Sequence, residues 1–528
     1  MTHKIDTRDA NCTDNTESNK GTTRRTFLKG VSAAGLCAAG TQAMSDRVSA
    51  HHGYLDDYGT VVNMVEDAGA DPNGDEPIND LLEEYADDDT MLLFPPGRYR
   101  MNRQFRFTGF EHFAIVGQYN VTIVPDNYHD FDDGGDWNYR LFRLGIDYNP
   151  GRDLLFEDIN IDQTADDTGV RVLEAAVEDD LTVRNVNVHG EHDSGAWGPG
   201  RFVVTDPDGS GVVENFNAPD GGDWSENTPG DKLWRGPTGI ICNNGNRGTI
   251  AFKDCSLGAF PDNGLYAANG SGKVIVDGGL YKNSQTASVR VGGNNSVVKN
   301  AKIIVDDSSG RGNQHALRVE SSNYLRIENC DIEVSDPNGD AIKTMDVDIL
   351  VFDGVELRTS GSDVVHGLVL QSKNKKARIK NSKFVHEADG GFSLWIEPSD
   401  EPAYIENCVF KGEGGHESAR AAIRCERDGT QFRNVAVEQM GTSRRRALVN
   451  TASDVLIYEG DYRSREYPII DHGNDVWIEG IYSRSERDLP GLKLSSSSDN
   501  AYIKKNNIVN GIRDDSGEAS GWGNNFSL

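Results

Sequence analysis

Three titratable residues, His315, Asp340 and His366, recur at one position of a repeated motif and could together move protons. Each stands two residues before the first apolar residue of a short segment in which apolar and polar residues alternate. Because alternation with period two is typical of β-strands, the three side chains would lie on successive strands roughly 5 Å apart. Histidine and aspartate can act as general acids or bases, so this column is a candidate catalytic centre.

A second column, directly after the same apolar residues, carries cations and an aromatic ring. Its residues, with two acidic residues that follow two positions later on the same face, are Arg290, Arg318, Lys343, Trp395, Glu320 and Glu397. Arg and Lys bind carboxylates or sulfates and tryptophan can stack on a sugar, so the pattern predicts a groove for an acidic glycan. We assign Arg318 and Lys343 to the catalytic group and the other four to substrate binding. The alternative is an exterior sheet of solvated charges.

A repeat of about 25 residues predicts the elements that position these columns. Each unit reads apolar-x-apolar-x-Asn-small-x-apolar, as in residues 325–332, and then holds a second short alternating segment. Both segments are expected to be strands, and the Gly, Asn, Ser and Asp residues between them form turns. The leucine-rich frame and the hexapeptide period of left-handed helices are both missing. The irregular spacing favours an all-β, right-handed parallel β-helix of about 12–14 coils.

Two polar or small positions in the repeat predict its turns. The asparagines Asn300, Asn329, Asn381, Asn407 and Asn434 are expected to stack as an amide ladder. Cys255, Cys330 and Cys408 occupy the next, small position. The part of the chain after the export segment has five cysteines and no Cys-x-x-Cys pair, so we expect packed thiols rather than disulfides or a zinc site.

The whole repeat region resembles the pectin-lyase-like superfamily. Residues 69–74 and 91–99 resemble the entry of pectate-lyase-superfamily and polygalacturonase-like proteins. Between them, Ile78, Leu81, Leu82 and Tyr85 form an amphipathic pattern that predicts a short helix covering the first coil.

Polygalacturonase-type hydrolases resemble this chain at Asp340 and His366, within Gly339-Asp340-Ala341-Ile342 and Val365-His366-Gly367-Leu368. The chain departs from that family at His315, which replaces an aspartate. An inverting hydrolase needs two carboxylates, and the column supplies one, so Asp363 or Glu320 would have to provide the other. A lyase needs instead a cation beside a uronate carboxylate and a base, which Arg318, Lys343 and His315 could supply. No metal site is predicted: no cofactor is required, and Ca²⁺, which many such lyases use, has no specific loop here.

The chain has 53 Lys+Arg against 84 Asp+Glu, a net charge of −31. This balance opposes nucleic-acid binding and favours adaptation to concentrated salt. Residues 23–29 carry the pair Arg24-Arg25 and precede a short apolar run, which resembles a twin-arginine export signal. We therefore expect the twin-arginine machinery as a transient partner, cleavage after Ala43 or Ala50, an extracellular or cell-surface location and no transmembrane segment after signal removal.

The expected organisation is an export and processing region (1–50), a cap with the first coils (51–125), the β-helix (126–510) and a polar tail (511–528). Residues 189–238, with Trp197, Trp224 and Trp234, are expected to interrupt the helix as one long insertion that either binds sugars or pins itself to the coil. The sequence thus predicts an exported protein that binds, and cleaves by lyase or hydrolase chemistry, an acidic polysaccharide. The alternative is a non-catalytic surface glycan-binding or adhesion protein.

Overall fold

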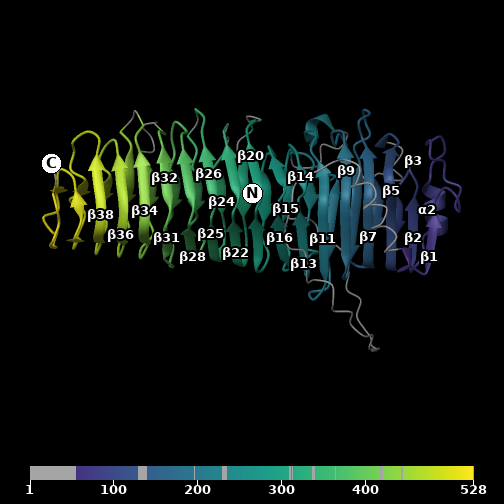
Figure 1. Cartoon of the computed structure of the whole chain (residues 1–528), viewed down its shortest axis with the longest axis horizontal. Coiled ribbons are helices and arrows are strands. Elements are labelled where there is room, and N and C mark those ends of the chain that lie inside the picture. The colour runs from purple at the N-terminus through teal and green to yellow at the C-terminus, as the bar shows by residue number, and fades with distance from the viewer. Residues whose placement is uncertain are drawn as a thin grey trace, which may run out of the picture. The chain divides into compact units, whose positions relative to one another are not determined.

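A computed structural model describes residues 55–128, 139–194, 197–228, 235–308, 311, 313–335, 339–362, 364–414, 420–441 and 444–526. The export region predicted at 1–50, Trp234 and Asp363 lie outside these residues. The described chain folds into stacked coils whose strands pair only in parallel within two sheets (Figure 1). Parallel strands joined by such crossovers wind in the right-handed sense, so the predicted right-handed parallel β-helix is confirmed.

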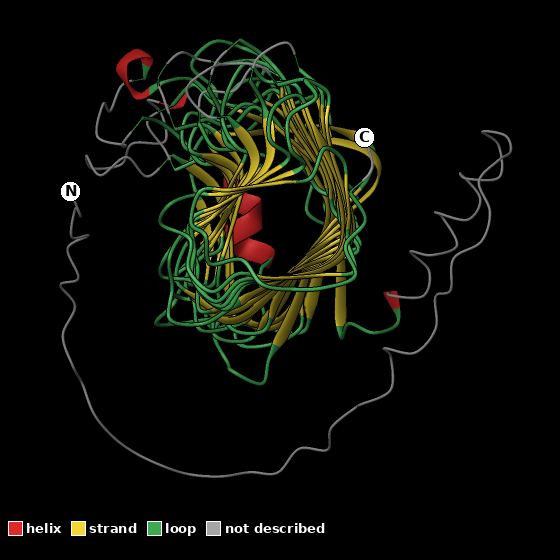
Figure 2. Cartoon of the chain, turned by 90° about the vertical axis from the view of Figure 1, so that its left-hand side faces the viewer, coloured by secondary structure: helices red, strands yellow, loops and turns green. Residues whose placement is uncertain are grey.

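The strands form three faces around one core (Figure 2). The 26-stranded sheet contains two runs joined by its longest strands. Its first run is β1 (Thr60–Asn63), β2 (Thr90–Phe94), β5 (Glu111–Pro125), β7 (Arg152–Asp162), β9 (Leu181–His189), β11 (Ser210–Ala218), β13 (Thr249–Lys253), β16 (Lys273–Asp277), β19 (Ser296–Lys299), β22 (Ser322–Glu328), β25 (Val347–Asp353), β28 (Lys376–Lys380), β31 (Ala403–Glu406), β34 (Gln431–Gln439), β36 (Leu456–Ser464), β38 (Trp477–Ser485) and β40 (Tyr502–Lys504). Its second run is β3 (Gly97–Met101), β14 (Ser256–Leu257), β17 (Leu280–Lys282), β20 (Lys302–Val305), β23 (Asp331–Val334), β26 (Glu356–Thr359), β29 (Lys383–His386), β32 (Val409–Gly412) and β41 (Asn507–Ile508).

The third face is a 16-stranded sheet with one strand from each coil. Its strands are β4 (Phe105–Phe107), β6 (Arg140–Leu144), β8 (Arg171–Val177), β10 (Gly200–Val204), β12 (Ile240–Ile241), β15 (Asn263–Ala267), β18 (Ala287–Val291), β21 (His315–Val319), β24 (Ile342–Thr344), β27 (Leu368–Leu370), β30 (Leu394–Ile396), β33 (Ala421–Cys425), β35 (Arg446–Asn450), β37 (Ile469–Asp471), β39 (Leu492–Leu494) and β42 (Ile512–Asp514). The coils therefore number about sixteen, more than the 12–14 expected from the repeat.

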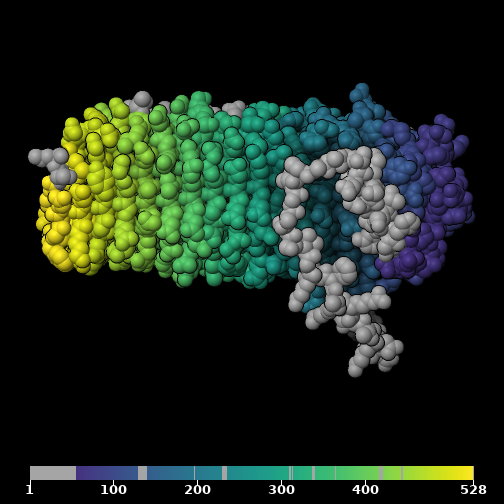
Figure 3. Space-filling view, in the orientation of Figure 1, coloured from purple at the N-terminus to yellow at the C-terminus, as the bar shows by residue number. Residues whose placement is uncertain are grey.

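The extra coils come from two regions that the repeat pattern did not resolve. Residues 189–238 contain β10 and β11, which pair in register with β8 and β9, so this region holds a complete coil between two loops rather than one long insertion. The sequence 511–526 likewise continues the stack, because β42 pairs with β39. Successive coils lie side by side as bands of colour in Figure 3.

The helical elements that lie wholly within the described residues are α2 (Asn79–Tyr85) and the 3-10 turn η2 (Ser225–Asn227). Ile78 and Leu82 are fully buried, and Leu81 and Tyr85 pack against the same core. In the end-on view this helix lies within the outline of the strands (Figure 2). Its apolar side therefore covers side chains of the first coils that would otherwise contact water.

The turns and the core follow the repeat. All five ladder asparagines have a positive φ, between 50° and 57°, and Asn434 donates to Asn407 at 2.9 Å. In the coil after Asn329, Gly354 occupies the same turn position in place of an asparagine. A Cβ at Gly354 would lie 2.6 Å from Oδ1 of Asn329. The five described cysteines are buried and unbonded to one another, which confirms the expectation of packed thiols.

Candidate functional site

The strand register brings the predicted catalytic column together on the 16-stranded sheet. His315 pairs with Ala287 of the previous coil. Two residues further along each strand, Leu317, Ile342 and Leu368 pair in turn. The residues two positions before them therefore occupy equivalent places on three consecutive coils, as the sequence predicted, with neighbouring strands roughly 4.8 Å apart.

His315 is almost fully buried, with 2% of its surface exposed. Its Nδ1–H donates to the backbone carbonyl oxygen of Asp340 at 2.6 Å. Burial is the main cause that lowers the pKa of the ring to about 4, so it is neutral near pH 7. Because the imidazole is neutral and shielded from solvent, it has little surface with which to contact a polymer.

His366 is half-buried and packed among aromatic rings. The backbone N–H of Phe392 donates to its Nδ1 at 3.1 Å, which places the remaining ring proton on Nε2. The ring stacks on Phe392 with centroids 5.1 Å apart and meets Trp395 edge-on at 5.0 Å. Burial also lowers the pKa of His366, which favours the neutral ring.

Asp340 is half-buried between the two neutral histidines. Its charge acts on both rings, where it opposes the effect of burial on their pKa. Of the two residues expected to provide a second carboxylate, Asp363 lies outside the described residues, and Glu320 is held by arginines. The described residues thus give the column one accessible carboxylate.

Glu320 is clamped between two cations of the second predicted column. Arg290 contacts Oε2 through NH2 at 2.7 Å, and Arg318 contacts Oε1 through NH2 at 2.5 Å. The carboxylate is 8% exposed, and the guanidinium of Arg290 lies 4.3 Å from the centroid of the Tyr266 ring. Two guanidiniums share one carboxylate, so this part of the sheet keeps excess positive charge.

Lys343, the next member of the column, makes no ion pair within the part of the chain that the structure describes. Trp395 donates its indole N–H to Glu426 at 2.9 Å, and its ring contacts Phe392 at 5.7 Å. Glu397 accepts the backbone N–H of Ser372 at 2.9 Å. Of the cations predicted for this site, Lys343 is therefore the one whose charge no described carboxylate pairs with, whereas Arg290 and Arg318 are held by Glu320.

The register extends this column over the whole 16-stranded sheet. We call the paired residues the outward column. They are Arg106, Arg143, Glu174, Arg201, Ile241, Tyr266, Arg290, Arg318, Lys343, Val369, Trp395, Arg424, Val449, Ile470, Lys493 and Arg513. Most are cationic and one is acidic, in a chain of net charge −31. The sequence had indicated the middle of this column but not its extent.

The sequence interpretation also missed a group of arginines near the N-terminal end of the column. Arg140, Arg143, Arg171 and Arg201 surround the buried carboxylate of Glu174. The pairs Arg140/Arg143 and Arg171/Glu174, each three residues apart, were the available signal. This signal did not lead to a predicted site, because the repeat is irregular in this region and residues 189–238 were interpreted as an insertion.

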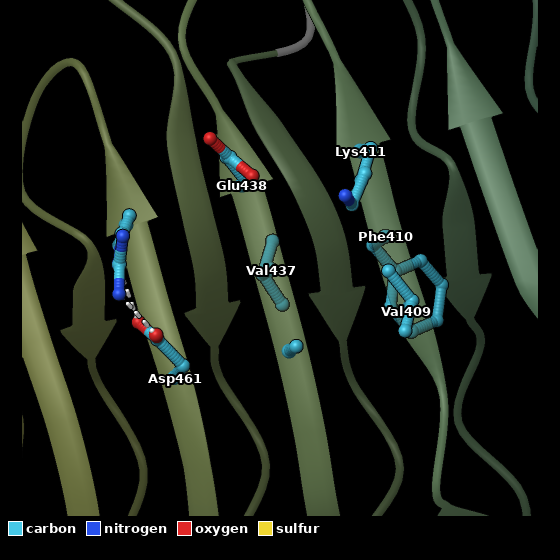
Figure 4. Close-up of a pocket in the computed structure, with 8 residues that line it drawn as sticks. Val409, Phe410, Lys411, Val437, Glu438 and Asp461 are labelled. Atoms are coloured by element: carbon cyan, nitrogen blue, oxygen red, sulfur yellow. Dashed lines mark hydrogen bonds and ion pairs between the residues drawn. The ribbon is translucent and has the colours of Figure 1, made fainter.

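Two other features contribute little to this site. A hollow of about 330 Å³ on the 26-stranded sheet forms where Ala436 lies between Val409 and Asp461, and an ion pair of 2.6 Å joins Arg463 to Asp461 (Figure 4). It contains no histidine and lies on another sheet. Of the two described tryptophans of residues 189–238, Trp224 packs under Arg311 and Trp197 is half-exposed.

Within the described ranges, no three histidine, cysteine or acidic side chains gather closely enough to hold a metal ion. The expectation that no cofactor is required, with Ca²⁺ lacking a specific loop, stays a prediction. The same ranges contain no helix with the length and apolar character needed to cross a membrane.

Fold and outward column together define an elongated parallel β-helix with one basic, partly aromatic face. Neither a family model nor a curated protein matches the sequence. Among solved structures, the chain is similar to the Agl-KA catalytic domain (11% identity over 88% of this chain and 68% of that one, TM-score 0.31). It is also similar to the GH87 α-1,3-glucanase of Streptomyces thermodiastaticus strain HF3-3 (11%, 83% and 68%, TM-score 0.28) and to PfbA, a surface adhesin of Streptococcus pneumoniae (11%, 88% and 93%, TM-score 0.28). These likenesses concern the fold alone.

Proposed function

We propose that the outward column binds an acidic polysaccharide outside the cell. The observation that carries this proposal is the line of paired cations and aromatic residues on a single sheet of a strongly acidic chain. The chain has fewer basic than acidic residues, so random placement would not concentrate the basic ones at one paired position of a single sheet. A polymer with regularly spaced negative charges is the class of ligand that such a line of cations can bind.

The spacing of the column suits a chain of acidic sugars. Cations on neighbouring coils lie roughly 4.8 Å apart, close to the length of one sugar residue, so carboxylates along a polymer can meet successive coils. Lys343 offers an ammonium that pairs with no carboxylate of the described residues, and Trp395 offers a ring face for stacking. At molar salt the Debye length falls to roughly 3 Å, so repulsion by the distant acidic surface is screened while direct contacts persist.

The binding test uses the full chain in molar salt with a panel of uronate-rich, sulfated and neutral glycans. Lys343→Gln should weaken binding to an acidic glycan by about tenfold, the value of one charge-assisted contact. Lys411→Gln, which removes an exposed lysine from the other sheet, is the matched control and should bind as the parent does. Equal loss in both variants, or equal binding of neutral glycans, would contradict the proposal.

Cleavage of the bound polymer is a second candidate, favoured by the half-buried Asp340 one coil from both His366 and His315. In a lyase reaction, a base removes the proton next to the uronate carboxylate and that electron pair forms a double bond. The glycosidic C–O bond breaks, and the departing sugar oxygen takes up a proton from water or a neighbouring acid. Lys343 would neutralise the carboxylate. Absorbance from unsaturated ends would identify a lyase, and reducing ends alone a hydrolase. Binding without either product would select the non-catalytic adhesion role.

Export through the twin-arginine route completes the proposal. Changing Arg24 and Arg25 together to lysine keeps the charge but removes the paired guanidiniums of the signal. The double variant should accumulate inside the cell, whereas the parent should be recovered outside it. Equal secretion of both would contradict this route without bearing on glycan binding.

A further inference from the structure

Glu174 on β8 is surrounded by arginines from three consecutive strands of the 16-stranded sheet. Its carboxylate is 4% exposed. Oε2 accepts from Nε of Arg140 at 2.8 Å and from NH1 of Arg171 at 2.9 Å. Oε1 accepts from Nε of Arg143 at 3.1 Å and lies 3.8 Å from NH1 of Arg201. We call these four arginines with Glu174 the arginine cluster.

The arginine cluster holds more positive charge than its acidic residues neutralise. Four guanidiniums share Glu174, and the one further carboxylate bound to them among the described residues is Asp147, which contacts NH2 of Arg201 at 2.9 Å and is 45% exposed. Arg106, the neighbour of Arg143 in the outward column, adds another cation. With Arg140 left out of the count, four guanidiniums still face two carboxylates, so this region carries excess positive charge; the guanidiniums are those of Arg106, Arg143, Arg171 and Arg201, and the carboxylates those of Glu174 and Asp147.

One guanidinium nitrogen of the cluster is buried without a partner. Arg171 is 3% exposed; its Nε donates to the carbonyl oxygen of Gly198 at 3.2 Å and its NH1 to Glu174, but its NH2 finds no acceptor among the residues that the structure describes. Burial is the main cause that lowers the pKa of Arg171 to about 9, and the cations Arg140 and Arg201 lower it further. A buried, unpaired N–H on a charged group is costly, so this arrangement favours a bound anion.

We propose that the arginine cluster is a preformed site for one oxyanion group, a carboxylate or a sulfate, carried on a sugar of the polymer. The inference rests on the proposed function, because the cluster lies in the same outward column as Lys343. An anion from solvent can reach the cluster at Arg143, because 23% of its side chain is exposed. Glu174 contacts Arg143 through Nε. Planar guanidiniums with several donors match the oxygens of both groups.

The test titrates the full chain by calorimetry with sodium sulfate, sodium glucuronate or methyl glucoside, at ionic strength held constant with sodium chloride. Sulfate or glucuronate should bind with one site per chain and methyl glucoside should not. Arg143→Gln should weaken that binding about tenfold, the effect of one charge-assisted hydrogen bond. Arg463→Gln removes a paired arginine from the other sheet and should bind the anions as the parent does.

Each outcome decides one point. Binding of sulfate alone identifies sulfated sugars as the source of the anion, and binding of glucuronate alone identifies uronates. No binding, the same affinity in Arg143→Gln and the parent, or an equal response to chloride from an adventitious ion only, would overturn the inference. Glu174→Gln removes the competing carboxylate and should bind sulfate or glucuronate more tightly. If small anions bind at the cluster but no polymer binds, the proposed function fails and the anion site stands.

Discussion

The imidazole of His315 donates its Nδ1–H to the backbone carbonyl oxygen of Asp340 on the next coil, at 2.6 Å. Because the acceptor is a backbone group, this bond ties two coils together whatever side chain residue 340 carries. Burial keeps the ring neutral. His315 therefore contributes first to the position of Asp340, while Asp340, His366 and Lys343 lie nearer to any ligand.

The low pKa of His315 predicts a loss of stability in acid. An unfolded histidine titrates near 6.5 and the folded one at about 4, so between these values the unfolded chain binds a proton that the folded chain does not. The free energy of unfolding should fall as the pH is lowered from 7 to 4, by about 3 kcal/mol from this residue. Urea midpoints at pH 7 and pH 4.5 measure it. His315→Gln should lose less stability than the parent over this range.

His189→Gln is the matched control, because His189 is exposed. It should keep the pH dependence of the parent. An identical dependence in His315→Gln and the parent would contradict the assignment to His315. It would leave the other histidines with a lowered pKa, His366, His386 and His472, as the candidates.

The clamp around Glu320 predicts opposite effects on stability and on binding. Glu320→Gln removes a charge that Arg290 and Arg318 share, so the free energy of unfolding should fall by about 1–3 kcal/mol. The two guanidiniums then keep their full charge, and an acidic glycan should bind several-fold more tightly. Glu438→Gln, at an exposed position on the other sheet, should change neither quantity. Weaker glycan binding in Glu320→Gln would argue that Glu320 itself contacts the polymer.

The sequence predicts the fold and the register of the central column because both follow from local patterns. Alternation around Leu317, Ile342 and Leu368 defines the strands, and turn residues define where each coil bends. Burial of His315 was not predictable, because it depends on the neighbouring coil. The arginine cluster was missed because its residues come from coils where the repeat is weakest.

The asparagine ladder predicts a position where glycine is tolerated better than alanine. Asn407 has a φ of 54°, donates to Asn381 and accepts from Asn434. Asn407→Gly and Asn407→Ala both lose the amide contacts. Glycine also removes the Cβ from the left-handed region, whereas alanine keeps it there at a cost of about 1–2 kcal/mol without the local hydrogen bonds of the asparagine. Urea unfolding should therefore rank the parent above Asn407→Gly and Asn407→Gly above Asn407→Ala. Alanine equal to glycine would mean that the turn changes its conformation.

The variant Asp340→Asn distinguishes a column that catalyses cleavage from a face that only binds the glycan. The substitution keeps the backbone carbonyl that His315 uses and the size of the side chain, so the urea midpoint at pH 7 should change little. It removes the one described carboxylate of the column, so any production of unsaturated or reducing ends should fall by at least about 100-fold, the usual contribution of a general acid or base. Asp208→Asn, an exposed aspartate in another coil, should cleave like the parent.

Because binding depends on the cations of the outward column, Asp340→Asn should still bind the glycan. If turnover persists at the parent rate while Lys343→Gln abolishes it, the proton is removed by another group and Asp340 is not the catalytic base or acid.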